Sequence, residues 1–418
     1  LDILPWGQTL LILCIVAFLL EGKTFKLRTP AGPLLVLFTV IVLASSVLAY
    51  SPRLAFNNLE LYLSWVLIYL LITNIVTTEQ RFFIFFLSFL LYSFKMSQHG
   101  ARSWAMRGFS FADWGVTGAP GWFHNSGEVG IQMCVFFPLA LGFYIALKGH
   151  WGKWRKLFFV LFPVTAVMTM IASSSRGALL GGGLVLLWIV LRSRYRVKAL
   201  VGAAVVTIAV VAFVPDEFKE RFSTMGEDKT SESRLVVWRY GMETAKQHPV
   251  LGIGYKNWSH YATRTYGRPL LPHNIFVEAA AELGYIGLLG FLLLIGATFW
   301  VNANTRKIVR RIPGDQHFLY QIAHGLDGAL IGYMASGFFI TVLFYPYFWI
   351  NLAMAVALNT AASNKARTAS QVMAAAATEP LVSPPADLAN DGRLRGGRGR
   401  LLLGQRGGAV LGPRGPRE

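Results

Sequence analysis

A histidine stands where a polar loop meets a long apolar run. His273 lies in the stretch Leu-Pro-His-Asn at 271–274, and apolar residues follow from Ile275. Arg176 holds a similar boundary in Ser-Ser-Ser-Arg-Gly at 173–177. Ionisable groups at membrane depth cost about 3 kcal/mol unless they are paired, so they are candidates for function. Histidine takes up protons near neutrality, and arginine holds phosphate oxygens with paired N–H groups. The two residues predict a base and an anion clamp on one face of a membrane protein.

Each of these residues also has a structural interpretation. His273 would serve as a cap on the helix that follows it, and Arg176 would extend toward a lipid headgroup. Glu278, one helical turn beyond the histidine, is expected to orient His273. His124 resembles His273, since both precede an asparagine and an apolar helix. Both interpretations of each residue stay open at this point.

The segment 215–272 supplies further candidates. Arg234, Trp238 and Arg239 lie in a stretch whose apolar residues recur at helical spacing. Arg234 and Arg239 are rival second clamps, or else part of a solvated helix face. Trp238 is expected to contact a substrate or to anchor the protein at the membrane interface. In the Gly- and aromatic-rich segment 96–126, Arg102, Arg107 and His124 are further candidates for substrate contacts.

The composition predicts a polytopic membrane protein. Of 418 residues, 54% are hydrophobic and 14% are charged, against about 25% charged in soluble domains. Apolar runs near 20 residues long must form helices in a bilayer. The expected spans are 3–20, 32–50, 60–76, 81–95, 127–147, 157–173, 177–191, 199–214, 274–302, 319–342 and 346–362.

Loop charge orients these spans. The net charge of +18 lies largely in short loops, as expected for loops that stay in the cytoplasm, and does not indicate nucleic-acid binding. The opposite set of connections, at 51–59, 96–126, 173–176, 215–272 and 343–345, is then periplasmic. This places residue 1 outside, so we expect one further helix upstream and twelve spans in all. Residues 1–362 form the expected transmembrane catalytic domain, and 363–418 an expected disordered, basic, cytoplasmic tail.

Familiar catalytic motifs are absent from the sequence. It has no H-E-x-x-H, G-x-S-x-G, P-loop or C-x-x-C, and no D-x-D pair in the outer segments. We therefore expect no metal and no cofactor, with arginines supplying the electrostatic stabilisation.

Taken together, the motifs resemble the O-antigen ligase superfamily, which includes O-antigen ligases, Wzy-type polymerases and O-oligosaccharyl ligases. The resemblance lies in Ser-Ser-Ser-Arg-Gly-Ala at 173–178, in Ser233-Arg234 with Trp238, Pro249 and Gly-x-Gly at 252–254, and in Pro-His-Asn at 272–274 before Glu-Leu-Gly at 282–284 and Gly287. The matching motifs lie within roughly residues 170–300, and the hydropathy pattern matches over most of residues 1–362.

The resemblance implies an all-α fold of the GT-C type with eleven or twelve transmembrane helices and a large helical periplasmic loop. It implies an enzyme of lipopolysaccharide biosynthesis that lies in the bacterial inner membrane, in contact with membrane lipids. Its active site would face the periplasm. A glycan would pass from undecaprenyl diphosphate to a hydroxyl of lipid A–core oligosaccharide. Carried over, Arg176 and Arg234 would hold the diphosphate, and His273 would act as general base or orient the acceptor. With such substrates, Trp238 is expected to stack on a sugar ring, and Arg102, Arg107 and His124 are candidates for contacts on the acceptor side.

Three alternatives remain open. A Wzy-type polymerase would use the same donor with a lipid-linked repeat as acceptor, and a protein O-oligosaccharyl ligase would use a Ser or Thr hydroxyl. A lipid or polysaccharide transporter is disfavoured, because the sequence shows no repeat and the unusual residues gather at one face instead of at midspan.

Overall fold

The structure is a computed structural model that describes residues 6–110, 115–118, 123, 125–193, 195–213 and 229–378. Across these ranges the regular elements are all helical, with no strand. In chain order they are α1 (Trp6–Leu20), α2 (Ala31–Val47), α3 (Pro52–Ile75), α4 (Glu79–Met106), α5 (Ser126–Leu147), the short 3-10 helix η1 (Lys148–His150), α6 (Lys153–Ala172), α7 (Arg176–Arg192), α8 (Arg196–Phe213), α10 (Lys229–Gln247), α11 (Trp258–Tyr266), α12 (Ile275–Val309), α13 (His317–Gly337) and α14 (Pro346–Thr378).

The prediction of an all-α polytopic membrane protein is confirmed. The expected spans correspond to α1 through α8 and α12 through α14. Among the described helices, four are long and apolar enough by themselves to cross a membrane: α3, α5 with η1, α6 and α12. The apolar parts of α1 and α2 are shorter. The segment between α8 and α12 contains two further helices, α10 and α11, where the large outer loop was expected.

Several boundaries differ from the sequence expectation. Helix α3 begins at Pro52, so it includes most of the outer connection expected at 51–59. Helix α4 continues to Met106, so the outer connection after it is shorter than 96–126. Its last turns pack on α6, where Thr169 Oγ1 donates to Ser97 O at 2.6 Å. Helix α12 reaches Val309. Helix α14 continues to Thr378, past the residue 363 at which the tail was expected to begin, and residues 379–418 lie outside the described ranges.

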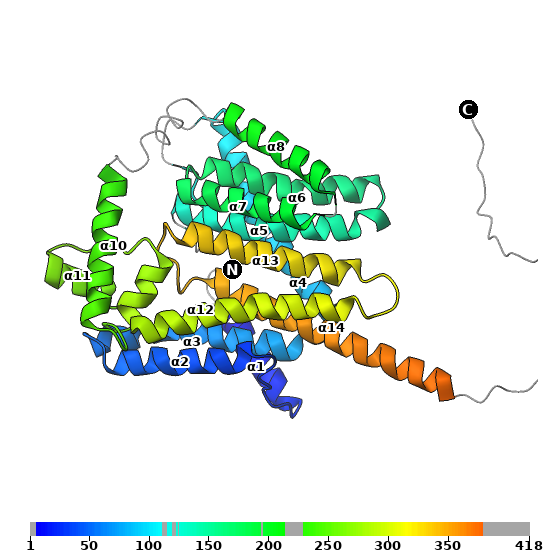
Figure 1. Cartoon of the computed structure of the whole chain (residues 1–418), viewed down its shortest axis with the longest axis horizontal. Helices are drawn as coiled ribbons and strands as arrows, with labels where there is room; N and C mark the ends of the chain where they lie inside the picture. The colour runs from blue at the N-terminus through cyan, green and yellow to red at the C-terminus, as the bar shows by residue number, and fades with distance from the viewer. Residues whose placement is uncertain are drawn as a thin grey trace, which may run out of the picture. The chain divides into compact units, whose positions relative to one another are not determined.

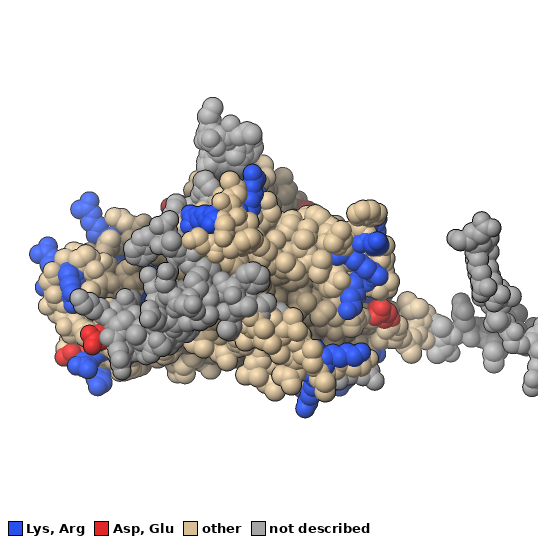
Figure 2. Space-filling view, turned by 90° about the horizontal axis from the view of Figure 1, so that it is seen from above, with Lys and Arg blue, Asp and Glu red and all other residues tan. Residues whose placement is uncertain are grey.

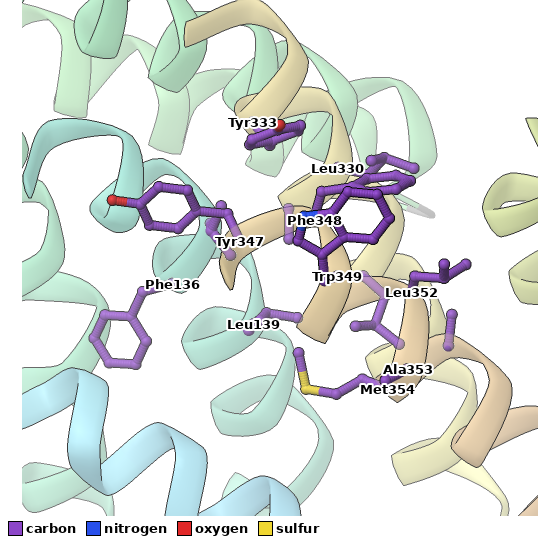
Figure 3. Packing of buried hydrophobic residues seen from close by; sticks show 14 of the residues in the cluster. Phe136, Leu139, Leu330, Tyr333, Tyr347, Phe348, Trp349, Leu352, Ala353 and Met354 are labelled. Atoms are coloured by element: carbon purple, nitrogen blue, oxygen red, sulfur yellow. The ribbon is translucent and has the colours of Figure 1, made fainter. Parts of the chain in front are cut away.

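Helix α5 lies at the centre of the unit that extends to Gln371, and packs against α6, α7 and α13 (Figure 1). Its buried residues surround the helix on every side, as in a helix enclosed by protein. Close contact with α13 depends on Gly332, where a Cβ would lie 2.8 Å from the Cys134 carbonyl oxygen. Tyr333, Phe348 and Trp349 join this core in an aromatic cluster (Figure 3).

The two sets of connections separated by loop charge lie at different ends of the helices. At the basic end, Lys26 N donates to Asn74 Oδ1 at 2.9 Å, and Lys365 pairs with Glu79. At the other end, Tyr50 N donates to Ile253 O at 2.8 Å. On the face shown in Figure 2, Lys and Arg side chains cluster at the two ends and few lie between them. The fold therefore gathers 51, 116, 173, 253, 273 and 341 at a common end, where the candidate residues lie.

Candidate active site

Three helix N-termini meet around residues 338–345, the segment between α13 and α14. At the start of α7, a Cβ on Gly177 would lie 3.0 Å from Phe339 Cβ. At the start of α5, a Cβ on Gly127 would lie 2.9 Å from Ile340 Cδ1. At the start of α12, His273 N donates to Thr341 Oγ1 at 2.9 Å. Helix N-termini carry partial positive charge, so this convergence favours a bound anion.

His273 is held by the residues on both sides of it. The Pro272 carbonyl accepts a hydrogen bond from Trp238 Nε1 at 3.0 Å. Asn274 Oδ1 accepts from Phe276 N at 2.9 Å and Val277 N at 3.2 Å, which makes Asn274 the N-cap of α12. The backbone of His273 is left-handed, with φ of 46°, a conformation unusual for a residue with a side chain. The cap expected of His273 is therefore supplied by Asn274.

The surroundings of His273 favour its neutral form. Burial lowers the pKa of the imidazole below its ordinary value of 6.5, and the nearby guanidinium of Arg234 lowers it further. Both effects disfavour the protonated ring. A neutral imidazole at pH 7 has a nitrogen lone pair that can take a proton from a hydroxyl group.

Of the two rival arginines on α10, Arg234 is the one beside His273. Its charge acts on the imidazole, and its side chain is half-buried. Arg239 is exposed. Five residues along a helix correspond to a rotation of about 140°, so the two side chains leave α10 in different directions. The geometry favours Arg234 as the second clamp.

Trp238 connects α10 to the segment that precedes α12 and contains His273. Besides the hydrogen bond to Pro272, its ring lies edge-on to Phe338, with centroids 5.1 Å apart. These contacts join α10, the N-terminus of α12 and the 338–345 segment. Stacking of Trp238 on a sugar ring stays a prediction.

Arg176 is the first residue of α7 and is half-buried. The serines before it shape the helix start. Ser175 Oγ accepts from Ala178 N at 3.3 Å as the N-cap, and Ser173 Oγ donates to Met170 O at 2.7 Å. Ser174 has a left-handed backbone with φ of 51°. Arg176 thus follows directly after a tight turn. The next residue, Gly177, contacts the 338–345 segment.

Gly252 and Gly254, in the turn after α10, pack against α12 where that helix is interrupted. At Gly284, φ is 71° and ψ is −176°, so the helix is interrupted. The carbonyls of Ala281 and Glu282 instead accept from Ile253 N at 3.0 Å and Gly254 N at 2.9 Å. A Cβ on Gly252 would lie 2.4 Å from the carbonyl carbon of Glu282. These motif residues hold the α10–α11 turn against the N-terminal part of α12, which follows His273.

The carboxylates of Glu278 and Glu282 on α12 both face residues of the α10–α11 turn. Glu282 accepts from Lys256 N at 3.0 Å and from Trp258 N at 3.1 Å. Glu278 Oε2 accepts from Leu343 N at 3.3 Å, and Glu278 Oε1 lies 4.0 Å from Lys256 Nζ. The expected direct contact of Glu278 with His273 is not among the contacts of the described chain. Sequence reasoning overlooked Lys256, whose partners lie more than 20 residues away.

Glu128 lies at the start of α5. Its Oε1 accepts from the Tyr345 hydroxyl at 2.7 Å, and its carbonyl oxygen accepts from the Tyr347 hydroxyl at 2.8 Å. These bonds tie the N-terminus of α5 to the start of α14. Over the described ranges, no group of three or more His, Cys, Asp and Glu side chains is placed to hold a metal ion.

The remaining candidates lie near the end of α4. Arg102 and Arg107 are exposed. The chain after α4 returns toward the Arg176 segment, since Val116 N donates to Ala172 O at 2.9 Å. His124 lies outside the described residues. Acceptor contacts by these three residues stay predictions.

Two comparisons with known proteins bear on the site. Residues 158–292 match the family model described as O-antigen ligase, and this range includes Arg176, Arg234 and His273. The chain is also similar to the exopolysaccharide production protein ExoQ of Rhizobium meliloti (strain 1021), with 30% identity over 86 residues. That match covers 18% of this chain and 20% of ExoQ, so it spans about one fifth of the relative's length.

Proposed function

We propose, because this chain belongs to the O-antigen ligase superfamily, that it transfers a glycan from undecaprenyl diphosphate to a hydroxyl of lipid A–core oligosaccharide. Membership makes it a multi-pass membrane protein of the ligase- or polymerase-type glycosyltransferases. The observation that carries the proposal is the placement of His273 beside Arg234, among three helix N-termini.

The diphosphate of the donor would lie at this convergence. Arg176 begins α7, and Arg234 lies next to His273 at the start of α12, so each arginine lies near the partial positive charge of a helix N-terminus. Such groups stabilise the negative charge that develops on a departing diphosphate. Because arginine stays protonated, the clamp works at any physiological pH.

His273 would act on the acceptor. Its neutral ring nitrogen takes the proton of the acceptor hydroxyl while that oxygen forms a bond to the anomeric carbon. The bond between the anomeric carbon and the diphosphate oxygen breaks, and undecaprenyl diphosphate leaves with the electron pair. The imidazolium then returns its proton to water. Low proton affinity suits this base, because it is regenerated readily near neutrality.

The site is proposed to face the periplasm of a bacterial inner membrane. Its end of the helices is opposite the short basic loops around Lys26, Arg81 and Arg310, which the positive-inside rule assigns to the cytoplasm. A lipid-linked diphosphate lies at headgroup depth, the level at which helix ends such as those of α7 and α12 occur.

A Wzy-type polymerase is the second candidate, and the similarity to a protein named for exopolysaccharide production favours it. The two activities share the donor site and differ in the acceptor. An assay separates them: purified protein receives an undecaprenyl-diphosphate-linked glycan with lipid A–core present, in EDTA. Glycan on lipid A–core supports the ligase. Lengthening of the lipid-linked glycan alone supports the polymerase, and no donor turnover contradicts both.

A further inference from the structure

Lys256 lies between the two buried carboxylates of α12. It follows α10 in the turn that leads to α11, and its backbone is left-handed with φ of 56°. Its N–H donates to Glu282 Oε2 at 3.0 Å. Its ammonium lies 4.0 Å from Glu278 Oε1 and 5.1 Å from the centre of the Phe344 ring. One residue therefore contacts α12 through both its backbone and its side chain.

The ammonium of Lys256 compensates a charge that is otherwise buried. The side chain of Glu278 is 2% exposed, whereas that of Lys256 is 26% exposed. A buried carboxylate without a counter-charge is strongly destabilising. Glu278 Oε2 meanwhile accepts the hydrogen bond from Leu343 N. The position of Leu343 thus depends on a carboxylate whose charge Lys256 balances.

Glu278 is connected to His273 through residues 341–343. Leu343 is two residues from Thr341, whose hydroxyl accepts the hydrogen bond from His273 N. We propose that Lys256 is a positioning residue that, through Glu278, fixes residues 341–343 and thereby the left-handed backbone of His273. The inference rests on the proposed function of His273 as the base. Lys256 itself need not touch the substrate.

The backbone of Lys256 indicates that its side chain matters. A left-handed conformation costs a residue with a Cβ roughly 1 kcal/mol, a cost that glycine would avoid. The turn already uses glycine at 252 and 254, both with positive φ. The ammonium at position 256 is therefore held in place against a backbone preference.

The test compares kcat and KM for the lipid-linked donor in four proteins: wild type, Lys256→Met, Lys256→Arg and the double variant Lys256→Met/Glu278→Gln. A small misplacement of a catalytic group can lower the rate by about 100-fold, so we expect kcat of Lys256→Met to fall by about 10- to 100-fold with little change in KM. Lys256→Arg should restore most of the rate. The double variant should exceed Lys256→Met, because the amide that replaces the carboxylate carries no charge and its oxygen still accepts from Leu343 N.

Lys246→Met is the matched control, since Lys246 is an exposed residue on α10. Wild-type kcat in Lys256→Met, or a double variant slower than the single one, would overturn the inference while leaving the proposed function intact. Wild-type protein without donor turnover would overturn both. Should Lys256→Met fail to fold, Lys256→Gln replaces it: kcat below wild type with unchanged KM is expected, and kcat equal to wild type would overturn the inference.

Discussion

The backbone N–H of His273 donates to the hydroxyl oxygen of Thr341 at 2.9 Å, across 68 residues of sequence. This bond connects the start of α12 to the segment between α13 and α14. It holds the histidine in its left-handed conformation, which few residues with side chains adopt. The geometry of the proposed base therefore depends on a residue far from it in the chain.

Thr341→Val removes this acceptor while keeping the shape of the side chain. The half-buried N–H of His273 then has no partner, which costs about 1–3 kcal/mol. We expect a lower thermal midpoint and a kcat reduced by about tenfold or more, with Thr341→Ser close to wild type. Thermal unfolding and donor turnover measured on the three proteins check this. Equal activity of the Val and Ser variants would show that the bond does not position the base.

The pKa of His273 should depend on Arg234. Burial and Arg234 both hold this pKa below 6.5, so the acid limb of kcat/KM should lie below pH 6.5. Arg234→Gln removes one cause and should raise the pKa toward 6.5, whereas exposed Arg239 should not matter. The rate at which diethyl pyrocarbonate modifies His273, followed against pH, measures this directly.

His273→Gln supplies the background in that experiment, and Arg239→Gln is the matched control. Because the folded-state pKa is lowered, the unfolded chain binds more protons below about pH 6.5. His273 therefore contributes stability at neutral pH that is lost as pH falls through this window. A larger shift in Arg239→Gln than in Arg234→Gln would reverse the assignment of the two arginines.

The break in α12 should tolerate no side chain. Gly284 has φ of 71°, and a Cβ there would lie 2.4 Å from Val250 O. We expect Gly284→Ala to cost more than about 1 kcal/mol and to displace the α10–α11 turn. Gly183→Ala in α7 is the control, since nothing lies within 4 Å of its Cβ position and alanine favours helix. Similar unfolding temperatures for both variants would contradict the assigned role of the break.

A buried ion pair far from His273 should affect stability alone. Arg306 Nη1 lies 2.6 Å from Asp327 Oδ2, and Asn302 Nδ2 donates to Asp327 Oδ1 at 2.8 Å. Arg306→Met leaves the buried carboxylate unpaired, which costs about 3–5 kcal/mol. Arg306→Met/Asp327→Asn should recover much of this loss. Thermal unfolding measures both, and a double variant less stable than Arg306→Met would contradict the account.

The helical spans, and the segment around His273 as a candidate site, could be predicted from sequence because they depend on local signals. Apolar run length marks the helices, and a titratable residue next to such a run marks His273. The end of α4 was missed because Lys95, His99 and Arg102 lower its hydropathy. Its packing compensates for this: a Cβ on Gly100 would lie 2.3 Å from Thr169 Cγ2, so the two helices are in close contact.

The partners of the charged residues could not be predicted in the same way. The side chains of Arg234 and Arg239 project from different sides of α10. The packing of Trp238 on Phe338 determines which side of α10 faces His273. Glu278 precedes its partner Leu343 by 65 residues. Lys256 is a single lysine in a turn, and only the fold brings it to Glu278 and Glu282. Such contacts depend on tertiary structure and leave no periodic pattern in the sequence.

The central claim is that His273 is the base of a glycan transfer. The most direct measurement is single-turnover transfer from an undecaprenyl-diphosphate-linked glycan by wild type and His273→Gln, with exposed His317→Gln as control. We predict that His273→Gln loses at least about 100-fold in rate while it still binds the donor, because removal of a general base costs about 10²–10⁴-fold. His317→Gln should match wild type. A folded His273→Gln protein that transfers the glycan at the wild-type rate would contradict the account.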